Sequence, residues 1–193
     1  MKKIILTAAA IFAFGYANAQ SREKGAIEIA PQIGYASSDL YGDSDIETDA
    51  MSSIAYGVGA DYFFNDRWSL RSGLLVQTMG AVDGLDEELK LQYLTIPVNA
   101  NWHFGSTRKW NLNFGPSIGF LTSAKLESED VKDGVNSTQI GLNVGIGYKI
   151  EVSPKFSILI DYQSISGLSK AFKENSSAKN AYGSFNVGAV IKL

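Results

Sequence analysis

The stretch from Gln139 to Val152 reads QIGLNVGIGYKIEV and alternates strictly between bulky apolar residues and small or polar ones. A period of two is the pattern of a β-strand, because successive side chains point to opposite faces of a sheet. The apolar face carries Ile140, Leu142, Val144, Ile146, Tyr148, Ile150 and Val152, and the other face carries Gln139, Gly141, Asn143, Gly145, Gly147, Lys149 and Glu151. The stretch therefore predicts a long strand whose two faces differ sharply in size and polarity.

The same alternation recurs seven more times along the chain, which predicts eight strands in all. Most of these segments are longer than the roughly five or six residues usual in soluble sheets. They suit the roughly 9–11 residues that a tilted strand needs to cross a bilayer. The other seven segments lie near residues 26–37, 54–64, 68–77, 94–104, 111–120, 156–163 and 184–193. Strand length thus favours a membrane barrel over a soluble sandwich.

Side-chain size indicates which face of these strands points outward. Eight strands enclose an interior that side chains just fill, and the bulky aliphatic and aromatic residues of eight strands would overfill it. The glycine, alanine, serine and asparagine residues of the opposite face would fit inside. A bulky apolar outer face must then meet lipid. We therefore predict an all-β fold, namely an eight-stranded antiparallel up-and-down transmembrane β-barrel.

The predicted connections alternate in length, beginning with a long one. Outer-membrane barrels have short periplasmic turns and longer outer loops, so the alternation suggests the orientation of the barrel. The short connections are residues 65–67, 105–109 and 153–155, and the long ones are residues 38–52, 80–88, 127–137 and 167–180. An even number of strands places both ends of the barrel domain on the periplasmic side.

Residues 1–19, MKKIILTAAAIFAFGYANA, have the features of a secretory signal peptide. A basic start is followed by an apolar stretch too short to span a bilayer as a helix, and residues 17–19 (ANA) fit the small-x-small cleavage rule. We expect cleavage after residue 19, a barrel domain over residues 20–193, and location in the bacterial outer membrane. An uncleaved N-terminal membrane anchor is the alternative.

Composition excludes several classes of chemistry. The chain has 193 residues, no cysteine and one histidine, His103. Disulfide frameworks, thiolate catalysis and sites with several histidine ligands are therefore impossible. The formal net charge of −3 argues against a nucleic-acid partner, which selects a basic face. Apolar residues at 45% and charged residues at 19% argue against a disordered chain.

Aromatic residues gather beside the predicted short turns. Aromatic rings favour the headgroup region of a membrane, where an apolar body meets a polar edge. We expect an aromatic girdle on the periplasmic side, with ordinary cross-strand aromatic pairing as the alternative. Its members are Trp68, Trp102, Trp110, Phe64, Phe104 and Phe156, and a second ring on the outer side would comprise Tyr35, Tyr56, Phe120 and Tyr162.

On these features the chain resembles the small outer-membrane β-barrel proteins of the OmpX and OmpA-barrel type, often called the porin family. The resemblance covers residues 20–193 and is carried by WSLRSGL (68–74), YLTIPV (93–98), FGP (114–116), residues 141–148 and a strand that ends the chain. It implies a monomer without cofactors. Its partners would be outer-membrane lipids, lipopolysaccharide, and the export and barrel-assembly machinery. Such proteins commonly end on an aromatic residue. This chain ends on Leu193, which falls on the apolar face of the last alternating segment.

Charged residues on the inward face predict an ion-pair network that fills the barrel. A lone buried charge is costly, and Asp61 and Arg71 are equidistant from the turn at Asp66, so they should lie opposite each other. The expected members are Glu28, Asp61, Arg71, Lys149, Glu151, Asp161 and Lys192. A gated conduit is the alternative.

Catalysis has one candidate, His103 with Ser69 and Asp66 near the same rim. The chain lacks a G-x-S-x-G elbow, so a rim histidine without catalytic function is the favoured interpretation, and we expect no enzyme activity. The first three outer loops are acidic, but residues 43–47 lack the glycine and glutamate spacing of an EF-hand calcium loop. We therefore expect solvated loops and no metal site.

Together these features predict a non-enzymatic integral outer-membrane protein whose extracellular loops carry a structural or surface-interaction role. A narrow passive pore or a barrel that binds small solutes is the first alternative. A soluble lipocalin-like carrier is the second.

Overall fold

The computed structural model describes residues 23–42, 48–84, 86–173 and 176–193. The expected signal peptide, residues 1–19, lies outside the described residues. Eight long strands make up almost all of the rest, with a two-residue strand β6 (Glu129–Asp130) and a 3₁₀ turn η1 (Lys132–Gly134) in one connection. The long strands are β1 (Ile27–Tyr41), β2 (Thr48–Phe63), β3 (Trp68–Asp83), β4 (Glu88–Phe104), β5 (Trp110–Leu126), β7 (Thr138–Ser153), β8 (Phe156–Gly167) and β9 (Lys179–Lys192).

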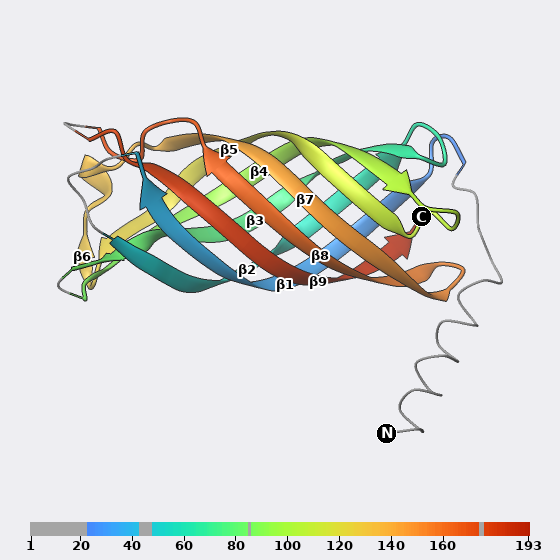
Figure 1. The fold of residues 1–193 in the computed structure, drawn as a ribbon, viewed down its shortest axis with the longest axis horizontal. Helices are drawn as coiled ribbons and strands as arrows, with labels where there is room; N and C mark the ends of the chain where they lie inside the picture. The colour runs from blue at the N-terminus through green and yellow to red at the C-terminus, as the bar shows by residue number, and fades with distance from the viewer. Residues whose placement is uncertain (1–22, 43–47, 85, 174–175) are drawn as a thin grey trace, which may run out of the picture.

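These strands form one closed antiparallel sheet. Each long strand pairs with its neighbour in the chain, β1 pairs with β9, and the pairing of β4 with β5 completes the ring. The strands cross the barrel at a slant (Figure 1), as closure of a sheet into a barrel requires. The predicted eight-stranded up-and-down barrel is confirmed.

The two ends of the barrel differ, and we call them the turn end and the loop end. The turn end holds the short connections at residues 64–67, 105–109 and 154–155, together with the described chain start and the C-terminus. The loop end holds the other connections and β6. Here the expected boundaries are wrong, because β1, β2, β3 and β4 continue through much of residues 38–52 and 80–88. The regular apolar alternation ends before these residues, yet the ladder between β3 and β4 continues as far as the pair Val82 and Glu88.

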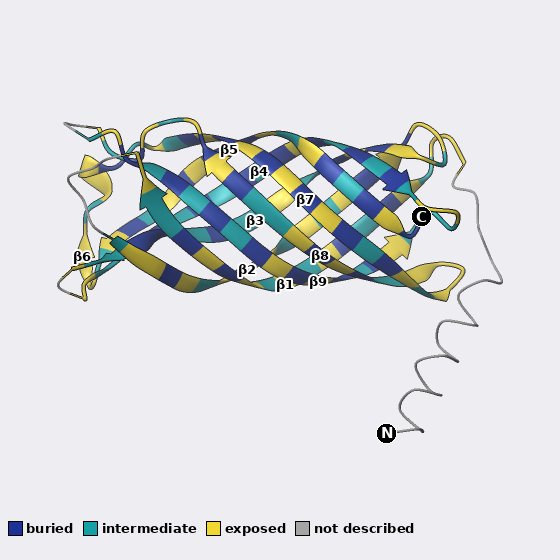
Figure 2. Ribbon diagram, viewed as in Figure 1, coloured by how far each residue is buried: buried dark blue, intermediate teal, exposed yellow. Residues whose placement is uncertain are grey.

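In the turn-end half of the barrel the bulky apolar residues face outward. Along β7, Ile140, Leu142 and Val144 are about half exposed, whereas Asn143 and Lys149 on the other face are buried. Figure 2 shows this alternation as bands of buried and exposed residues that run around the barrel. The exposed apolar surface, which we call the apolar belt, is far larger than a soluble protein tolerates and is typical of a surface that meets lipid.

In the loop-end half the polarity is reversed. An apolar cluster fills the interior there, and the outward side chains are polar, as at Ser52, Thr122 and Lys125. The cluster comprises Ala36, Ala55, Met79, Leu91, Tyr93, Leu121, Ala124, Val135, Ile165, Ala171 and Tyr182. The expectation of a small polar lining throughout is wrong in this half. Its strands extend beyond the belt, so water surrounds them and they bury apolar residues inside, as soluble barrels do.

Two connections fold over the loop end and form a lid, which we define as residues 131–137 and 168–173. Val135 and Phe172 form an isolated β-bridge, and Asn136 donates its side-chain Nδ2 to the carbonyl oxygens of Lys170 and Phe172 at 3.0 and 2.9 Å. Val135 and Ala171 are buried against the apolar cluster. The lid therefore closes the cluster off from solvent at this end.

Candidate functional site: the filled interior

An aspartate–arginine pair occupies the centre of the polar interior. The register of β2 and β3 sets Asp61 directly opposite Arg71, and both side chains are buried. Arg71 donates Nη2 to Asp61 Oδ2 at 2.9 Å and Nε at 3.2 Å, while Ser69 and Asn101 each donate to Asp61 Oδ1 at 2.8 Å. The carboxylate thus receives charge-assisted bonds on both oxygens, which offsets the cost of its burial.

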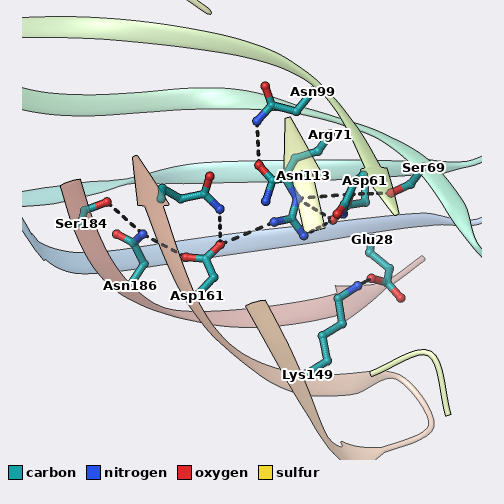
Figure 3. Close-up of polar contacts among 12 residues, drawn as sticks. Glu28, Asp61, Ser69, Arg71, Asn99, Asn113, Lys149, Asp161, Ser184 and Asn186 are labelled. Carbon is teal, nitrogen blue, oxygen red and sulfur yellow. Dashed lines mark hydrogen bonds and ion pairs between the residues drawn. The ribbon is translucent and has the colours of Figure 1, made fainter. Parts of the chain in front are cut away.

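The same arginine reaches across the barrel to a second carboxylate. Arg71 Nη1 lies 3.5 Å from Asp161 Oδ2 on β8, and Figure 3 shows the guanidinium between the two carboxylates. Gln163 Nε2 and Asn186 Nδ2 donate to Asp161, each at 2.9 Å. Three strands, β2, β1 and β9, separate β3 from β8 around the sheet. The contact is therefore a bridge through the lumen.

A second ion pair lies nearer the turn end. Lys149 of β7, fully buried, donates to Glu28 of β1 (Figure 3), and its ammonium lies 5.4 Å from the ring centroid of Phe63. That ring in turn packs on His103, with centroids 4.8 Å apart. Phe63 was not expected as an inward residue. It lies two positions after Asp61, however, and therefore on the same face of β2. Aromatic contact and ion pairing together hold the buried ammonium group in place.

The remaining predicted members are placed at the turn-end rim. Glu151 lies 3.4 Å from Nζ of Lys109, which is buried. The alternating pattern does not reveal this lysine, because it lies in a short connection before β5. Lys192 is aligned with Glu28 in the register of β1 and β9. It forms no ion pair with any residue in the described ranges, so the structure does not bring it into contact with the other predicted members.

Neutral amides make up the rest of the lining. Asn99 donates to Asn113 at 2.8 Å, and Ser117 donates to Asn143 at 2.9 Å, which joins β4, β5 and β7 across the interior. All four side chains are buried. These residues carry no charge and were not among the predicted members of the network. Their positions in the alternating pattern are nevertheless sufficient to predict that they point inward.

One small cavity lies between the polar and apolar layers. It has a volume of about 40 Å³ and is lined by Asp61, Arg71, Gln77, Asp161 and Gln163 among others. That space suits about three water molecules. A second cavity of about 20 Å³ lies beside it and shares Gln32, Gln77 and Gln163 in its lining.

The candidate catalytic residues lack the geometry of a hydrolase. Ser69 Oγ lies 2.9 Å from His103 Nε2, but the same hydroxyl also bonds Asp61, and both residues are buried inside the barrel. Asp66, the predicted acid, lies outside in the turn and pairs with Arg108 at 3.2 Å. In a catalytic triad the acid would orient the histidine instead.

The predicted girdle residues surround the turn end. Rings stack in series from Trp68 to Trp102 (6.3 Å between centroids), Phe104 (5.0 Å) and Trp110 (6.2 Å), and Tyr148 extends the row at 4.8 Å. Phe64 packs edge-on against Tyr62 at 5.6 Å, and Phe156 is exposed at the start of β8. On the outer side of the belt Tyr35, Tyr56, Phe120 and Tyr162 are exposed.

The described residues offer no cluster of metal ligands. No group of three or more histidine, aspartate or glutamate side chains among them is placed to hold a metal ion. No helix in this part of the chain combines the length and apolarity needed to cross a bilayer.

A closed eight-stranded barrel with an apolar belt, an aromatic row at the turn end and a polar, ion-paired interior defines the class of small outer-membrane β-barrel proteins. Comparison with known proteins identifies the family. The model of the outer membrane protein beta-barrel domain matches residues 6–192, and the chain belongs to that family.

Solved structures with the same fold are distant in sequence. Neisserial surface protein A is 18% identical with a TM-score of 0.57, and the match covers 86% of this chain and 97% of that one. The outer membrane protein OprG from Pseudomonas aeruginosa is 15% identical with the same TM-score, over 89% and 97%. The N-terminal β-barrel domain of OprF from Pseudomonas aeruginosa is 14% identical with a TM-score of 0.54, over 89% and 100%. Among curated proteins, no sequence matches significantly.

Proposed function

We propose that this protein is a closed, non-conducting barrel of the bacterial outer membrane, without enzymatic activity, whose loop end faces the cell exterior and carries a surface-interaction role. One observation above all supports the closed state: Arg71 bridges Asp61 and Asp161 across the lumen. The apolar cluster and the lid fill the other half. A permeating ion would have to break a buried charge network and then cross an apolar layer, and both steps are costly.

The pore alternative would require continuous space, and the cavity of about 40 Å³ is too small for a solute. The outward orientation of the loop end follows from the short connections at the opposite end, since periplasmic turns are the short ones. Exposed acidic and basic side chains on the loop end, such as Glu129, Asp130, Lys170 and Lys173, suit contact with polar partners.

Planar-bilayer conductance of the purified, refolded chain tests this proposal. We expect no stable openings for the wild-type protein. The Arg71→Ala/Asp61→Asn/Asp161→Asn variant, which removes the bridge without leaving a buried charge, should also remain closed because the apolar layer persists. Stable large channels in the wild-type protein would overturn the closed-barrel proposal and support the pore.

A further inference from the structure

We propose that the interior of the barrel binds one small monovalent cation, of about the size of sodium, beside the bridge from Asp61 through Arg71 to Asp161. The site is the pair of adjoining cavities at the boundary of the polar and apolar layers, which we call the lumenal chamber. The inference goes beyond the proposed function, because neither a closed barrel nor a surface role of the loop end requires a bound ion.

The charges beside the lumenal chamber do not balance. Asp61 and Asp161 share one guanidinium, that of Arg71, and all three side chains are buried and line the chamber. Lys149, which lies nearer the turn end, is paired with Glu28. Two carboxylates against one guanidinium therefore leave one negative charge in excess. An uncompensated buried charge is costly, so it favours the uptake of a counter-ion.

Asp161 is the carboxylate with the weaker compensation. Arg71 donates Nη2 and Nε to Asp61 Oδ2 at 2.9 and 3.2 Å, whereas its Nη1 lies 3.5 Å from Asp161 Oδ2. Two neutral amides also donate to Asp161, Gln163 Nε2 to Oδ2 and Asn186 Nδ2 to Oδ1, each at 2.9 Å. Because an ionised carboxylate offers about four lone pairs, Asp161 keeps capacity for a cation.

A buried amide oxygen in the wall of the chamber provides a second contact. Gln77 of β3 is 3% exposed and lines both cavities, and its Oε1 has no hydrogen-bond partner among the described residues. A buried acceptor without a partner lowers the stability of the fold. Carboxylate and amide oxygens are the ligands that hard cations prefer. The wall therefore places a suitable oxygen beside the excess negative charge.

The size of the chamber and the size of the excess charge indicate the class of ion. The two cavities have volumes of about 40 and 20 Å³, and one water needs about 10–15 Å³. A small ion with about one or two waters fits this space, whereas a bulky organic cation does not. One positive charge is sufficient for neutrality. Calcium would need about six to eight oxygen ligands, and no group of three or more acidic or histidine side chains in the described ranges is placed to hold a metal.

Urea unfolding of the refolded chain in vesicles of zwitterionic lipid tests the site. The bridge lies on one side of the chamber and the apolar cluster and lid on the other, so the chain is refolded in each salt before the measurement. One series contains sodium chloride, and the other contains tetramethylammonium chloride at the same ionic strength, because this organic ion is too large for the chamber. Both are run at pH 8, where an ordinary histidine is neutral, which limits the contribution of His103.

We expect the wild-type barrel to be more stable in sodium chloride. At a concentration ten times its Kd, an ion that binds only the folded state raises the folding equilibrium constant about elevenfold. Asp161→Asn removes the excess charge and should abolish the difference between the two salts. Gln77→Leu removes the buried oxygen and should reduce that difference, and it keeps the test available if Asp161→Asn does not fold.

Asp66→Asn, which removes a carboxylate from the exposed turn, is the matched control and should keep the full difference between the salts. Each variant is compared with itself in two salts, so a general loss of stability does not imitate a loss of ion binding.

Equal stability of the wild-type barrel in the two salts would overturn the inference and leave water as the occupant of the chamber. An undiminished sodium effect in both chamber variants would also overturn it, since the ion would then bind exposed carboxylates. The same holds if Asp66→Asn loses the effect as fully as Asp161→Asn does. Stable channels in the bilayer recording would overturn the closed-barrel proposal instead, which distinguishes that failure from failure of the cation site.

Discussion

Arg71 and Asp161 lie 90 positions apart in the chain and on strands that are not neighbours, yet Nη1 of one is 3.5 Å from Oδ2 of the other. The guanidinium bonds Asp61 at the same time. One cation therefore serves two buried carboxylates, and both lose their main counter-charge if it is removed.

Replacement of Arg71 by Met should therefore lower the free energy of unfolding by about 3–5 kcal/mol, since it leaves uncompensated buried charge. Denaturant unfolding in lipid vesicles measures this loss. Arg67→Met, in the exposed turn, is the matched control and should be nearly neutral. Addition of Asp61→Asn and Asp161→Asn to the Arg71→Met variant should restore most of the stability. If Arg71→Met unfolds at the wild-type midpoint, the bridge does not stabilise the barrel.

A pair of glycines offers a test of packing in the sheet. Gly59 and Gly73 are direct partners in β2 and β3. A Cβ on Gly73 would meet the Val58 carbonyl oxygen at 2.4 Å, whereas a Cβ on Gly59 would have no neighbour closer than 3.8 Å. Gly73→Ala should destabilise the barrel by about 1–3 kcal/mol. Gly59→Ala should be neutral or stabilise it by up to about 1 kcal/mol. Denaturant unfolding of both variants checks this difference, and equal effects would contradict the close approach of β2 to Gly73.

The lid depends on Asn136. Its amide donates to two carbonyl oxygens of the facing segment, and each such bond contributes about 0.5–1.5 kcal/mol. Asn136→Ala should accelerate hydrogen exchange at the amides of residues 171 and 173, which bond Ala178 and Gly134, while exchange in β7 stays unchanged. Lys170→Ala, which keeps the acceptor carbonyl, is the control. Unchanged exchange in Asn136→Ala would show that the backbone bonds between the two lid segments and their packing on the apolar cluster hold the lid without the Asn136 side chain.

Within the aromatic row, Trp102 stacks against rings on both sides. Trp102→Ala should lower the free energy of unfolding in lipid vesicles by about 1–3 kcal/mol, because two ring contacts are lost at about 0.5–1.5 kcal/mol each. Phe156, which has no ring contact within the described ranges, provides the comparison. Phe156→Ala should cost less. The two remaining tryptophans of the three in the chain still report unfolding by fluorescence. A larger loss for Phe156→Ala would show that ring stacking is not the main source of stability in the row.

Much of the fold could be predicted from the sequence. Alternation in stretches such as 139–152 indicated the strands and their two faces, and the narrowness of an eight-stranded barrel indicated the direction of those faces. The rule failed at Met79, Leu91 and Tyr93, which are apolar and point inward. The rule assumed that lipid surrounds the full length of every strand. The strands continue past the belt into water, and there apolar side chains favour the interior and polar ones the outer face.

The site was predicted in composition and only partly in arrangement. Asp61 and Arg71 could be aligned because a short turn fixes the register of one hairpin. Lys109 and Phe63 were missed, and Lys192, a predicted member, forms no ion pair within the described ranges. Local periodicity tells which residues point inward. It does not tell which of them meet.

The sequence by itself determined the strands, the outward apolar face and the inward polar one, because these depend on a period of two and on side-chain size. Only the tertiary structure decided that Arg71 bridges to Asp161, that the interior changes from polar to apolar, and that Asn136 holds a lid over it. Those contacts join strands that are not paired or segments beyond the strands. Their positions depend on the tilt and stagger with which the sheet closes, and no local pattern encodes that geometry.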